Sequence, residues 1–547
     1  MRETAGNRLE SWKEIAAYLN RGVRTVRRWE TEEGLPVHRH VHRTLGSVYA
    51  YKSEIDAWRE NRPDRPAPPA GREAGGGPAA STVTSIAVLP FTNLSTDPDN
   101  AYFADGLTEE VIADLSKVRP LRVISRLSSM AFKDTKKELK TVAQELGVRY
   151  ILQGSARRAG KQLRISAQLI DAIRDEHLWA ESYDGTLEDV FAIQERLARV
   201  IVAALELRLT DDEHHRLADR PIRDLHAYEC YLRARYEAWR WRRDAIDHAI
   251  QLLHNGLAMV GDNARLYGAL GHAHLQYREG GIDLGERPLA EAERCAQKVF
   301  ALEPRSALGF RLHGWVQYAR GQIQDAVRNL KTALELDPND ADALLLVCNC
   351  YLISGKVSAA RPLIGRLQSL DPLTPLTRCL PGFADASEGN LPAAVEPYRQ
   401  MFDMDPGNPM GRLFYVWVLS LNGRHEEVAT LVEGFSFAER ESVPARTARF
   451  LAHAHGRRQQ EALACVTPEI EAIATTSDVF ARFLAEGYSM AGDADRAIDW
   501  LESAVDRGYI NYPFLARYDP CLEPVRSQPR FQRLLEVVRE RWQSFEA

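Results

Sequence analysis

The chain has 547 residues, of which 70 are Lys or Arg and 76 are Asp or Glu, so its formal net charge is −6. At about 150 residues per domain, this length predicts three or four units and excludes a single small fold. A hydrophobic fraction of 45% and a charged fraction of 27% exclude disorder along the whole chain. The slightly acidic balance excludes a protein that coats nucleic acid with its entire surface, but it leaves room for a small basic module.

A boundary follows residue 62. The stretch 63–83 is rich in Pro, Gly and Ala, cannot bury a core, and predicts a linker. Before it, residues 1–62 contain 12 Lys or Arg and 9 Asp or Glu, a net charge of +3, which leaves −9 for the rest of the chain. We therefore expect a basic head and an acidic body.

The head has the pattern of two short helices joined by a tight turn. Ser11 and Glu14 form a capping box before a first helix, and Gly22 supplies the turn. A second helix is predicted over 24–30, with Val23, Val26 and Trp29 facing inward and with Arg24, Thr25, Arg27 and Arg28 on the outside. A β-hairpin over 35–51 and a last helix over 54–59 complete the head.

These segments, SWKEIAAYL, RTVRRWE, EGLPVHRHVH and GSVYAYKSEIDAW, resemble the MerR/excisionase-like winged helix-turn-helix family over residues 9–60. The resemblance implies that the head binds double-stranded DNA, with the second helix in the major groove. A basic wing suits contacts with the adjacent phosphates. The residues expected to contact DNA are Arg21, Arg24, Thr25, Arg27, Arg28, His38, Arg39, His40 and Arg43.

Two alternatives stay open for the head. It could be a small packing domain with a solvated basic face. His38, His40 and His42 alternate, so on a strand they would share one face and could bind a metal, but no Cys, Asp or Glu in the hairpin completes such a site. We therefore expect no metal here.

Residues 84–212 alternate between strand and helix patterns, which predicts an α/β sandwich. The predicted strands are IAVLPF (86–91), LRVIS (121–125), 150–158, 162–170 and 179–183. The predicted helices are 107–115, capped by Thr108 after a turn at Asp105-Gly106, then 139–146 and 190–209. The phrases FADGLTEEVIADL, LRVISRLSSMAFK and ELGVRYILQGSARRAGKQLRISAQLIDA resemble the TolB amino-terminal-like (FlgO-like) domain, which implies a sensor or assembly module.

The remainder has a period of 34 residues. Prolines recur at positions 304, 338, 372 and 406, and glycines recur at 321, 355, 389 and 423. Such a period, with small residues at fixed offsets, predicts a tetratricopeptide (TPR) array that forms an all-α superhelical solenoid. We expect about eight repeats over 221–510 and a capping segment over 511–547.

The first helix of each repeat should line a concave groove that binds a protein or peptide. Candidate groove residues are Arg311, Trp315, Tyr318, Asn349 and Leu352. A clamp for a peptide carboxylate is not in place, because Trp315 occupies a key position of it.

The chemistry of an enzyme has little support in the sequence. There is no HExxH and no GxSxG, and the seven cysteines form no CxxC pair, so we expect no enzyme, no cofactor and free thiols in a reducing compartment. No leader and no run of about 18 apolar residues is present. These patterns predict a cytoplasmic protein that does not contact a membrane.

Two functions of different classes follow. The first is a DNA-binding transcriptional regulator whose TolB-like and TPR parts bind a protein or peptide. A homodimer is expected with it, because one short DNA-binding head should bind weakly alone. The second is a TPR signalling scaffold whose head binds a protein in place of DNA.

Overall fold

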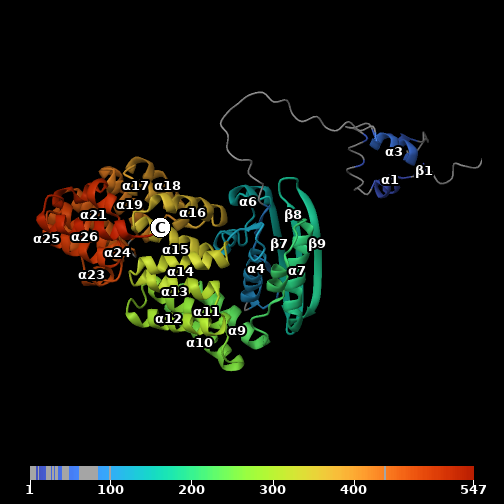
Figure 1. Ribbon diagram of the computed structural model, residues 1–547, viewed down its shortest axis with the longest axis horizontal. Helices are drawn as coiled ribbons and strands as arrows, with labels where there is room; N and C mark the ends of the chain where they lie inside the picture. The colour runs from blue at the N-terminus through green and yellow to red at the C-terminus, as the bar shows by residue number, and fades with distance from the viewer. Residues whose placement is uncertain are drawn as a thin grey trace, which may run out of the picture. The chain divides into compact units, whose positions relative to one another are not determined.

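The chain forms two compact units, Met1–Ala80 and Ser81–Ala547. In the computed structural model (Figure 1), the described residues are 8–9, 11–19, 26, 30, 35–39, 48–60, 84–97, 100–436 and 439–547. The predicted linker, 63–83, lies outside them, and the boundary between the two units falls within it.

The described part of the N-terminal unit consists of β1 (Arg8–Leu9), α1 (Trp12–Tyr18), β2 (His38–Arg39), β3 (Val48–Tyr51) and α3 (Lys52–Glu60). Strand β3 pairs antiparallel with β1 on one side and with β2 on the other. Ile15, Val26 and Ile55 are fully buried in its core, and Val26 belongs to the predicted inward face of the second helix. Ser11 Oγ accepts a hydrogen bond from Glu14 N at 3.3 Å, as the predicted cap requires.

The second unit begins with a mixed sheet in the strand order β6-β4-β7-β8-β9, with β5 beside β7. The pairs of β4 with β6 and β7 are parallel, whereas β7, β8 and β9 form an antiparallel meander. The strands are β4 (Thr84–Val88), β5 (Thr92–Asn93), β6 (Leu121–Val123), β7 (Tyr150–Ala159), β8 (Gln162–Asp171) and β9 (Glu176–Thr186).

Helices cover the two faces of this sheet unequally. α4 (Ala101–Ser116) and α7 (Val190–Ala204) pack on one face over β7, β8 and β9. On the other face, α6 (Leu139–Leu146), with the segment after α5 (Arg126–Met130), covers β4 and the beginning of β7. The α6 side of β8 and β9 is left open, and the short turn η2 (Leu187–Asp189) leads from β9 into α7.

Helix α4 begins earlier than predicted. Asp105 and Gly106 lie inside the helix, so the predicted turn there is wrong. Thr108 is not an N-cap either, because its Oγ1 donates to the Ala104 carbonyl oxygen and accepts from Phe91 N, both at 2.9 Å. Gly106 is tolerated because Leu232 packs against it, and a Cβ at this position would lie 2.8 Å from Leu232 Cδ2.

The rest of the unit is a long helical solenoid that follows α8 (Asp211–Ala218), with helices paired in sequence from α9/α10 to α24/α25 (Figure 1). Gly321, Gly355, Gly389 and Gly423 each take a positive φ, between 64° and 84°, in the turn within a pair, at the predicted period. The helices are α9 (Leu225–Ala238), α10 (Arg243–Val260), α11 (Ala264–Glu279), α12 (Glu286–Leu302), α13 (Ala307–Ala319), α14 (Ile323–Leu336), α15 (Ala341–Ile353), α16 (Val357–Leu370), α17 (Pro375–Ser387), α18 (Leu391–Met404), α19 (Pro409–Leu421), α20 (His425–Glu433), α21 (Val443–His455), α22 (Gln459–Cys465), α23 (Pro468–Ala474), α24 (Asp478–Met490) and α25 (Ala494–Asp506).

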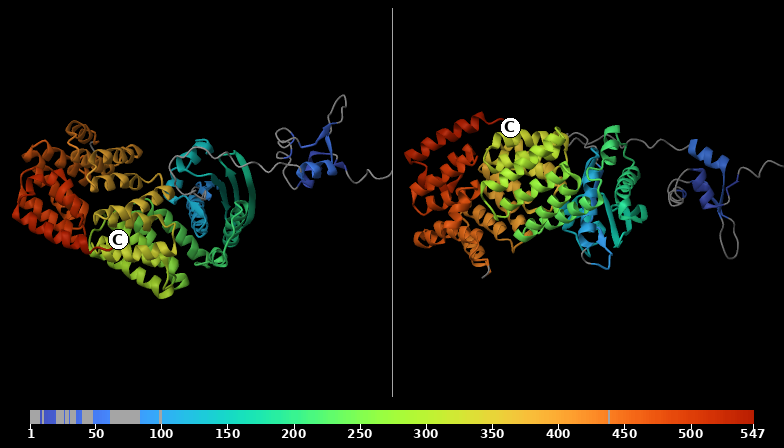
Figure 2. Two further views of the ribbon diagram at one scale, coloured as in Figure 1. Left: turned by 45° about the horizontal axis from the view of Figure 1, so that its top comes forward. Right: turned by 90° about the horizontal axis from the view of Figure 1, so that it is seen from below.

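After the last pair, the chain forms η3 (Phe514–Tyr518), η4 (Pro520–Val525) and α26 (Pro529–Ser544). The C-terminus then returns to the middle of the array. Glu546 N donates to Gln324 Oε1 at 2.9 Å, and Gln324 Nε2 donates to the Glu546 carbonyl oxygen at 3.1 Å. Both views of Figure 2 accordingly place the C-terminus beside the yellow-green helices of the array.

Candidate functional site

Most of the residues predicted to contact DNA lie outside the described part of the chain: Arg21, Arg24, Thr25, Arg27, Arg28, His40 and Arg43. For Arg39 only the backbone, in β2, is described. His38 is the member whose side chain is placed. Its Nε2 lies 2.6 Å from Glu54 Oε2 of α3, and its ring stacks on Tyr49 at 5.1 Å between centroids. These contacts fix the orientation of the His38 ring on the hairpin surface.

The predicted groove residues of α13 contact other parts of the same chain. Arg311 is largely buried and forms ion pairs with Asp342 at 2.5 Å and with Asp340 at 3.4 Å. Burial raises the pKa of Asp340 to about 6, against the opposing effect of Arg311. Trp315 Nε1 donates to Glu279 Oε1 at 3.3 Å. Burial raises the pKa of Tyr318 well above its usual value.

On α15, Asn349 is half-buried, but Leu352 has no exposed surface. The end of this helix is held by the C-terminal segment. Asn511 Nδ2 donates to the Leu352 carbonyl oxygen at 3.1 Å and to Ser387 Oγ at 3.2 Å, and Ile510 N donates to the Ile353 carbonyl oxygen at 3.0 Å. The bond from Ile510 satisfies a carbonyl group at the end of α15, whereas the Leu352 carbonyl oxygen also accepts from Gly355 N at 3.0 Å.

The residues 507–518 pass along the turns of three successive repeats. A Cβ at Gly321 would lie 2.8 Å from the backbone of Arg507, one at Gly355 would lie 2.7 Å from Asn511 Oδ1, and one at Gly389 would lie 2.5 Å from the Tyr518 ring. We call 507–518 the strap. It places part of the predicted groove lining under the chain's own C-terminal segment. The role of Arg311, Trp315, Tyr318, Asn349 and Leu352 as partner contacts stays a prediction.

A buried polar cluster lies under the strap. Glu486 accepts a hydrogen bond from Trp417 Nε1 at 2.8 Å, and the Arg482 guanidinium lies 4.7 Å from the centroid of the Trp417 ring. Burial, reinforced by the neighbouring Asp519 carboxylate, raises the pKa of Glu486 well above its usual value. Burial also raises the pKa of Asp519 to about 6. The two carboxyl groups therefore retain protons at pH values where exposed ones are ionised.

The first repeats hold the α/β domain through charged side chains. Glu109 of α4 forms an ion pair with Arg126 at 3.1 Å and accepts a hydrogen bond from Arg235 of α9. Glu110 accepts from Arg265 of α11 at 2.8 Å. Burial acts to raise the pKa of Glu109, but Arg235 and Arg126 outweigh it and the pKa is lowered. Glu109 is therefore ionised in this junction, and Glu110 is paired with Arg265.

A second contact joins the α/β domain to the turn between α16 and α17. Asp371 Oδ1 accepts from Ser125 Oγ and from Ser128 Oγ, the latter at 2.7 Å, and Asp371 Oδ2 accepts from Thr377 Oγ1 at 3.2 Å. Leu373 N donates to Ser128 Oγ at 2.9 Å. The solenoid is thus bonded to the α/β domain at α9, at α11 and at the turn after α16.

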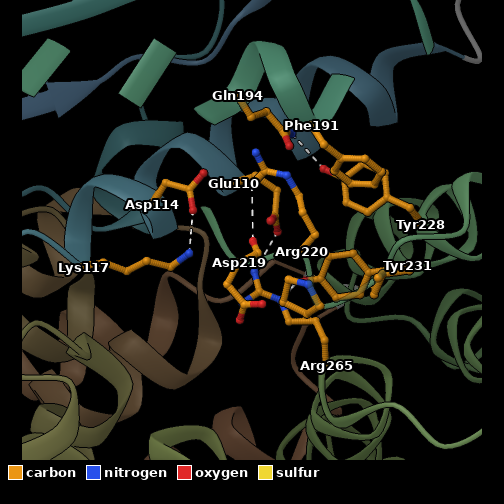
Figure 3. A pocket seen from close by; sticks show the side chains of 12 residues that line it. Glu110, Asp114, Lys117, Phe191, Gln194, Asp219, Arg220, Tyr228, Tyr231 and Arg265 are labelled. Carbon is orange, nitrogen blue, oxygen red and sulfur yellow. Dashed lines mark hydrogen bonds and ion pairs between the residues drawn. The ribbon is translucent and has the colours of Figure 1, made fainter. Parts of the chain in front are cut away.

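A cavity of about 30 Å³ lies at this junction (Figure 3). The close-up shows Asp114 and Lys117 on one side of it and Tyr231 and Arg265 on the other, with Glu110 and Arg220 between them. Its volume accommodates water molecules and is far below the several hundred Å³ of small-molecule sites. The twelve lining residues are Glu110, Asp114, Lys117, Phe191, Gln194, Asp219, Arg220, Pro221, Ile222, Tyr228, Tyr231 and Arg265.

A wider hollow of about 630 Å³ lies on the open face of the sheet. Its lining includes uncharged polar residues of neighbouring strands, such as Gln153 of β7, Gln168 of β8 and Ser182 of β9, together with the acidic residues Asp134 and Glu181. Ser166 Oγ and Ser182 Oγ lie 2.8 Å apart. Such a surface can exchange hydrogen bonds with a polar ligand, but its described residues include no identified reactive group.

Within the described ranges, no group of three or more His, Cys, Asp or Glu side chains is placed to hold a metal ion. None of the helices in the described part of the chain combines the length and the apolar composition that crossing a membrane requires.

Comparisons with protein families identify two segments. Residues 81–200 match the second domain of the HilA/YgeH-like transcriptional regulators, and residues 317–376 match the tetratricopeptide repeat. The chain therefore combines a regulator-type α/β domain with a repeat array of a protein-interaction class. The predicted TPR repeats are confirmed.

A curated relative from Rhizobium meliloti, "Putative adenylate cyclase 3", is 44% identical over 203 residues, which are 37% of this chain and 35% of the relative. The chain thus spans about a third of the length of the curated relative that it matches. The prediction that the chain is not an enzyme is contradicted by this finding. The absence of hydrolase and metalloprotease motifs was too narrow a basis for excluding enzymatic activity.

Solved structures give similar, more distant counterparts. A thermophilic TPR protein of Thermus thermophilus, TTC0263, is 19% identical with a TM-score of 0.29, over 35% of this chain and 98% of that one. YrrB, described as a TPR protein with an unusual peptide-binding site, is 16% identical with a TM-score of 0.26, over 39% of this chain and 96% of that one. TolB from Acinetobacter baumannii is 19% identical with a TM-score of 0.18, over 22% of this chain and 28% of that one.

Proposed function

We propose that the chain is a cytoplasmic DNA-binding regulator in which the N-terminal unit binds DNA and the body binds a protein or peptide. The observation that carries this proposal is the order of the parts. A separate basic head, with a net charge of +3 on residues 1–62, precedes a segment that matches the second domain of transcriptional regulators. The body has a net charge of −9, so the phosphates of DNA repel it. The head is therefore the part that we expect to contact DNA.

Electrophoretic mobility shift or fluorescence anisotropy with the full-length chain tests the DNA contact. We expect the affinity to fall as salt rises, and the triple change R24A/R27A/R28A to weaken binding and lower the slope of log affinity against log salt by about 2 to 3. The matched control is R294A/R328A/R399A, which removes three largely exposed arginines from the body. Equal losses in both variants, or a salt slope near zero, would contradict the proposal and favour the scaffold function.

The relative's name favours a second candidate, conversion of ATP to cyclic AMP. The match leaves about two thirds of that relative without a counterpart in this chain. Incubating the purified chain with ATP and Mg²⁺ or Mn²⁺ and quantifying cyclic AMP by chromatography tests it. Product above the blank would establish the activity, and its absence would remove this candidate.

The partner of the body is proposed to be a protein or peptide. The TPR match supports this class, and the part of the concave surface that the strap leaves uncovered, near Asn349, is where we place the contact. Pull-down with residues 81–547 tests whether partners are retained without the head, since this range is a compact unit.

A further inference from the structure

The two edges of the α/β sheet differ greatly. Strand β6, at one edge, has 3 residues, whereas β9, at the other, has 11. Short edge strands are one way in which proteins prevent unwanted pairing, and a long edge offers a row of free backbone N–H and C=O groups. Among the described residues, β9 pairs with β8 alone. Figure 1 shows β9 as the last strand of the sheet.

We propose that a second copy of the chain pairs its own β9 antiparallel with this edge, so that two sheets become continuous across a two-fold axis. The register that pairs all 11 residues, Glu176–Thr186, places the midpoint Glu181 on the axis and sets Trp179 opposite Tyr183 of the other copy. A symmetric interface of this kind repeats each contact twice. The proposal goes beyond the DNA-binding function and does not depend on it.

The side chains beside the axis fit this register. Trp179 and Tyr183 flank Glu181 on the same face, with ring centroids 6.5 Å apart. Aromatic side chains contribute to pairing across antiparallel strands; Tyr183 is only 6% exposed, so the half-buried Trp179 supplies the aromatic surface at this edge. Trp179 Nε1 is buried and has no hydrogen-bond partner among the described residues.

The charges are also self-complementary. Glu181 Oε2 lies 3.4 Å from an Arg196 guanidinium nitrogen, and the two side chains are 39% and 63% exposed. Two Glu181 carboxylates facing each other would repel, but each brings an arginine that neutralises the pair and can reach across the axis. No other like-charged residues face each other in this register, because Glu176 meets Thr186 and Asp184 meets Leu178. Leu178, 39% exposed, adds apolar surface on the open face.

The charge arrangement gives a direct test in the full-length chain, by light scattering coupled to size exclusion. We expect the wild type to have the mass of two chains, E181R and R196E each to shift to the mass of one chain, and E181R/R196E to restore the dimer. The control is E145R, which removes a comparably exposed ion pair, Glu145 with Lys137, away from the edge. A monomeric wild type, or dissociation by E145R as complete as by E181R, would overturn the proposal.

A cysteine at the axis tests the register separately. Directly opposed residues of antiparallel strands have Cα atoms about 4.5 to 5.5 Å apart, within the range that a disulfide spans. With oxidised glutathione as the oxidant, E181C should form a covalent dimer, whereas A180C, whose partner in this register is Ser182, should form far less. The wild type is the blank, because six of its seven cysteines are buried. Stronger cross-linking of A180C than of E181C would exclude this register, and cross-linking of neither would exclude the interface.

Because these measurements are made without DNA, their failure leaves the DNA-binding proposal standing. Conversely, loss of DNA binding in R24A/R27A/R28A with an intact dimer would show that the interface does not depend on the recognition helix.

Discussion

The solenoid holds two other parts of the chain by different means. At the α/β domain, an apolar contact that includes Leu232 is accompanied by buried ion pairs, in which Glu109 and Glu110 pair with arginines of the first repeats. Along the strap, the contacts are backbone hydrogen bonds and buried aromatic rings, such as Phe514. Removing one partner of a buried ion pair strongly destabilises the folded protein, because the other charge stays buried alone. The stability of an apolar contact depends instead on the area that it buries. The two contacts should therefore respond to different substitutions.

The largest expected effect on stability comes from removing the Glu109 carboxylate at the junction with the α/β domain. Glu109→Ala leaves Arg126 and Arg235 buried without their carboxylate, and we expect it to lower the free energy of unfolding by about 3 to 5 kcal/mol. Chemical denaturation of the full chain measures this. Glu138→Ala, at an exposed glutamate whose side chain does not cap α6, is the control and should stay within about 0.5 kcal/mol. Similar losses in both would show that the junction does not depend on the Glu109 charge.

The next effect separates the two contacts by pH. The pKa of Asp519 is raised to about 6 in the folded chain, against about 3.9 when unfolded. The folded state thus binds the proton more tightly, so the stability is full below about pH 4 and falls as pH rises through about 6. The shift corresponds to about 3 kcal/mol at most.

Asp519→Asn should remove most of this fall between about pH 4 and 7, which denaturation at a series of pH values would show. The exposed Asp499→Asn should leave it unchanged. The ionised Glu109 contact, whose pKa is lowered, should weaken only in acid. An unchanged pH profile in Asp519→Asn would remove Asp519 as its source.

The smallest expected effect is a difference in stability between two glycine variants, and it reports how tightly the strap packs on Gly389. Gly389 and Gly423 occupy the same turn of successive repeats, with φ of 84° and 65°. A Cβ at Gly423 meets none of the described atoms within 4 Å, whereas one at Gly389 meets Tyr518. Gly423→Ala should cost about 1 to 2 kcal/mol from backbone strain alone.

Gly389→Ala should cost at least about 1 kcal/mol more, because it also overpacks the strap. Thermal melting of the two variants side by side measures the difference. Equal costs would mean that Tyr518 yields freely and that the strap is loosely held there.

Local rules predict the elements that are set by local interactions. The 34-residue glycine period gives the turns at Gly321, Gly355 and Gly389 because positive φ is a local requirement. The strands β7 and β8 agree with their patterns to within a residue, because alternation along a strand is also local. Strand β9 extends beyond the predicted 179–183 at both ends, where polar residues weaken the pattern.

The same rules cannot predict contacts that depend on two completed surfaces. Asp371 precedes a proline of the repeat signature, and nothing around it indicates Ser125 and Ser128, which lie more than 240 residues away. Gly106 predicts a turn, but packing of Leu232 against it keeps the helix continuous. The partners of Glu109 and Glu110 on α9 and α11 leave no trace in the sequence around α4. The sequence predicts the groove residues to be on the surface. It gives no periodic signal that residues 507–518 pass back along the same repeats.

The hydrogen bonds between Gln324 and Glu546 join residues 222 positions apart. They connect the segment after α26 to α14, so the repeats from α14 to α25 are contacted at both ends by the same chain segment. An open solenoid can lose repeats one after another from a free end, because each repeat contacts only its neighbours. Here the departure of α26 would also break these bonds to α14, so fraying from this end is opposed by contacts outside the neighbouring repeat. The closure also imposes an order on biosynthesis: the middle repeats leave the ribosome before the strap and Glu546 do, so they acquire these contacts only after residues 507–546 have been made.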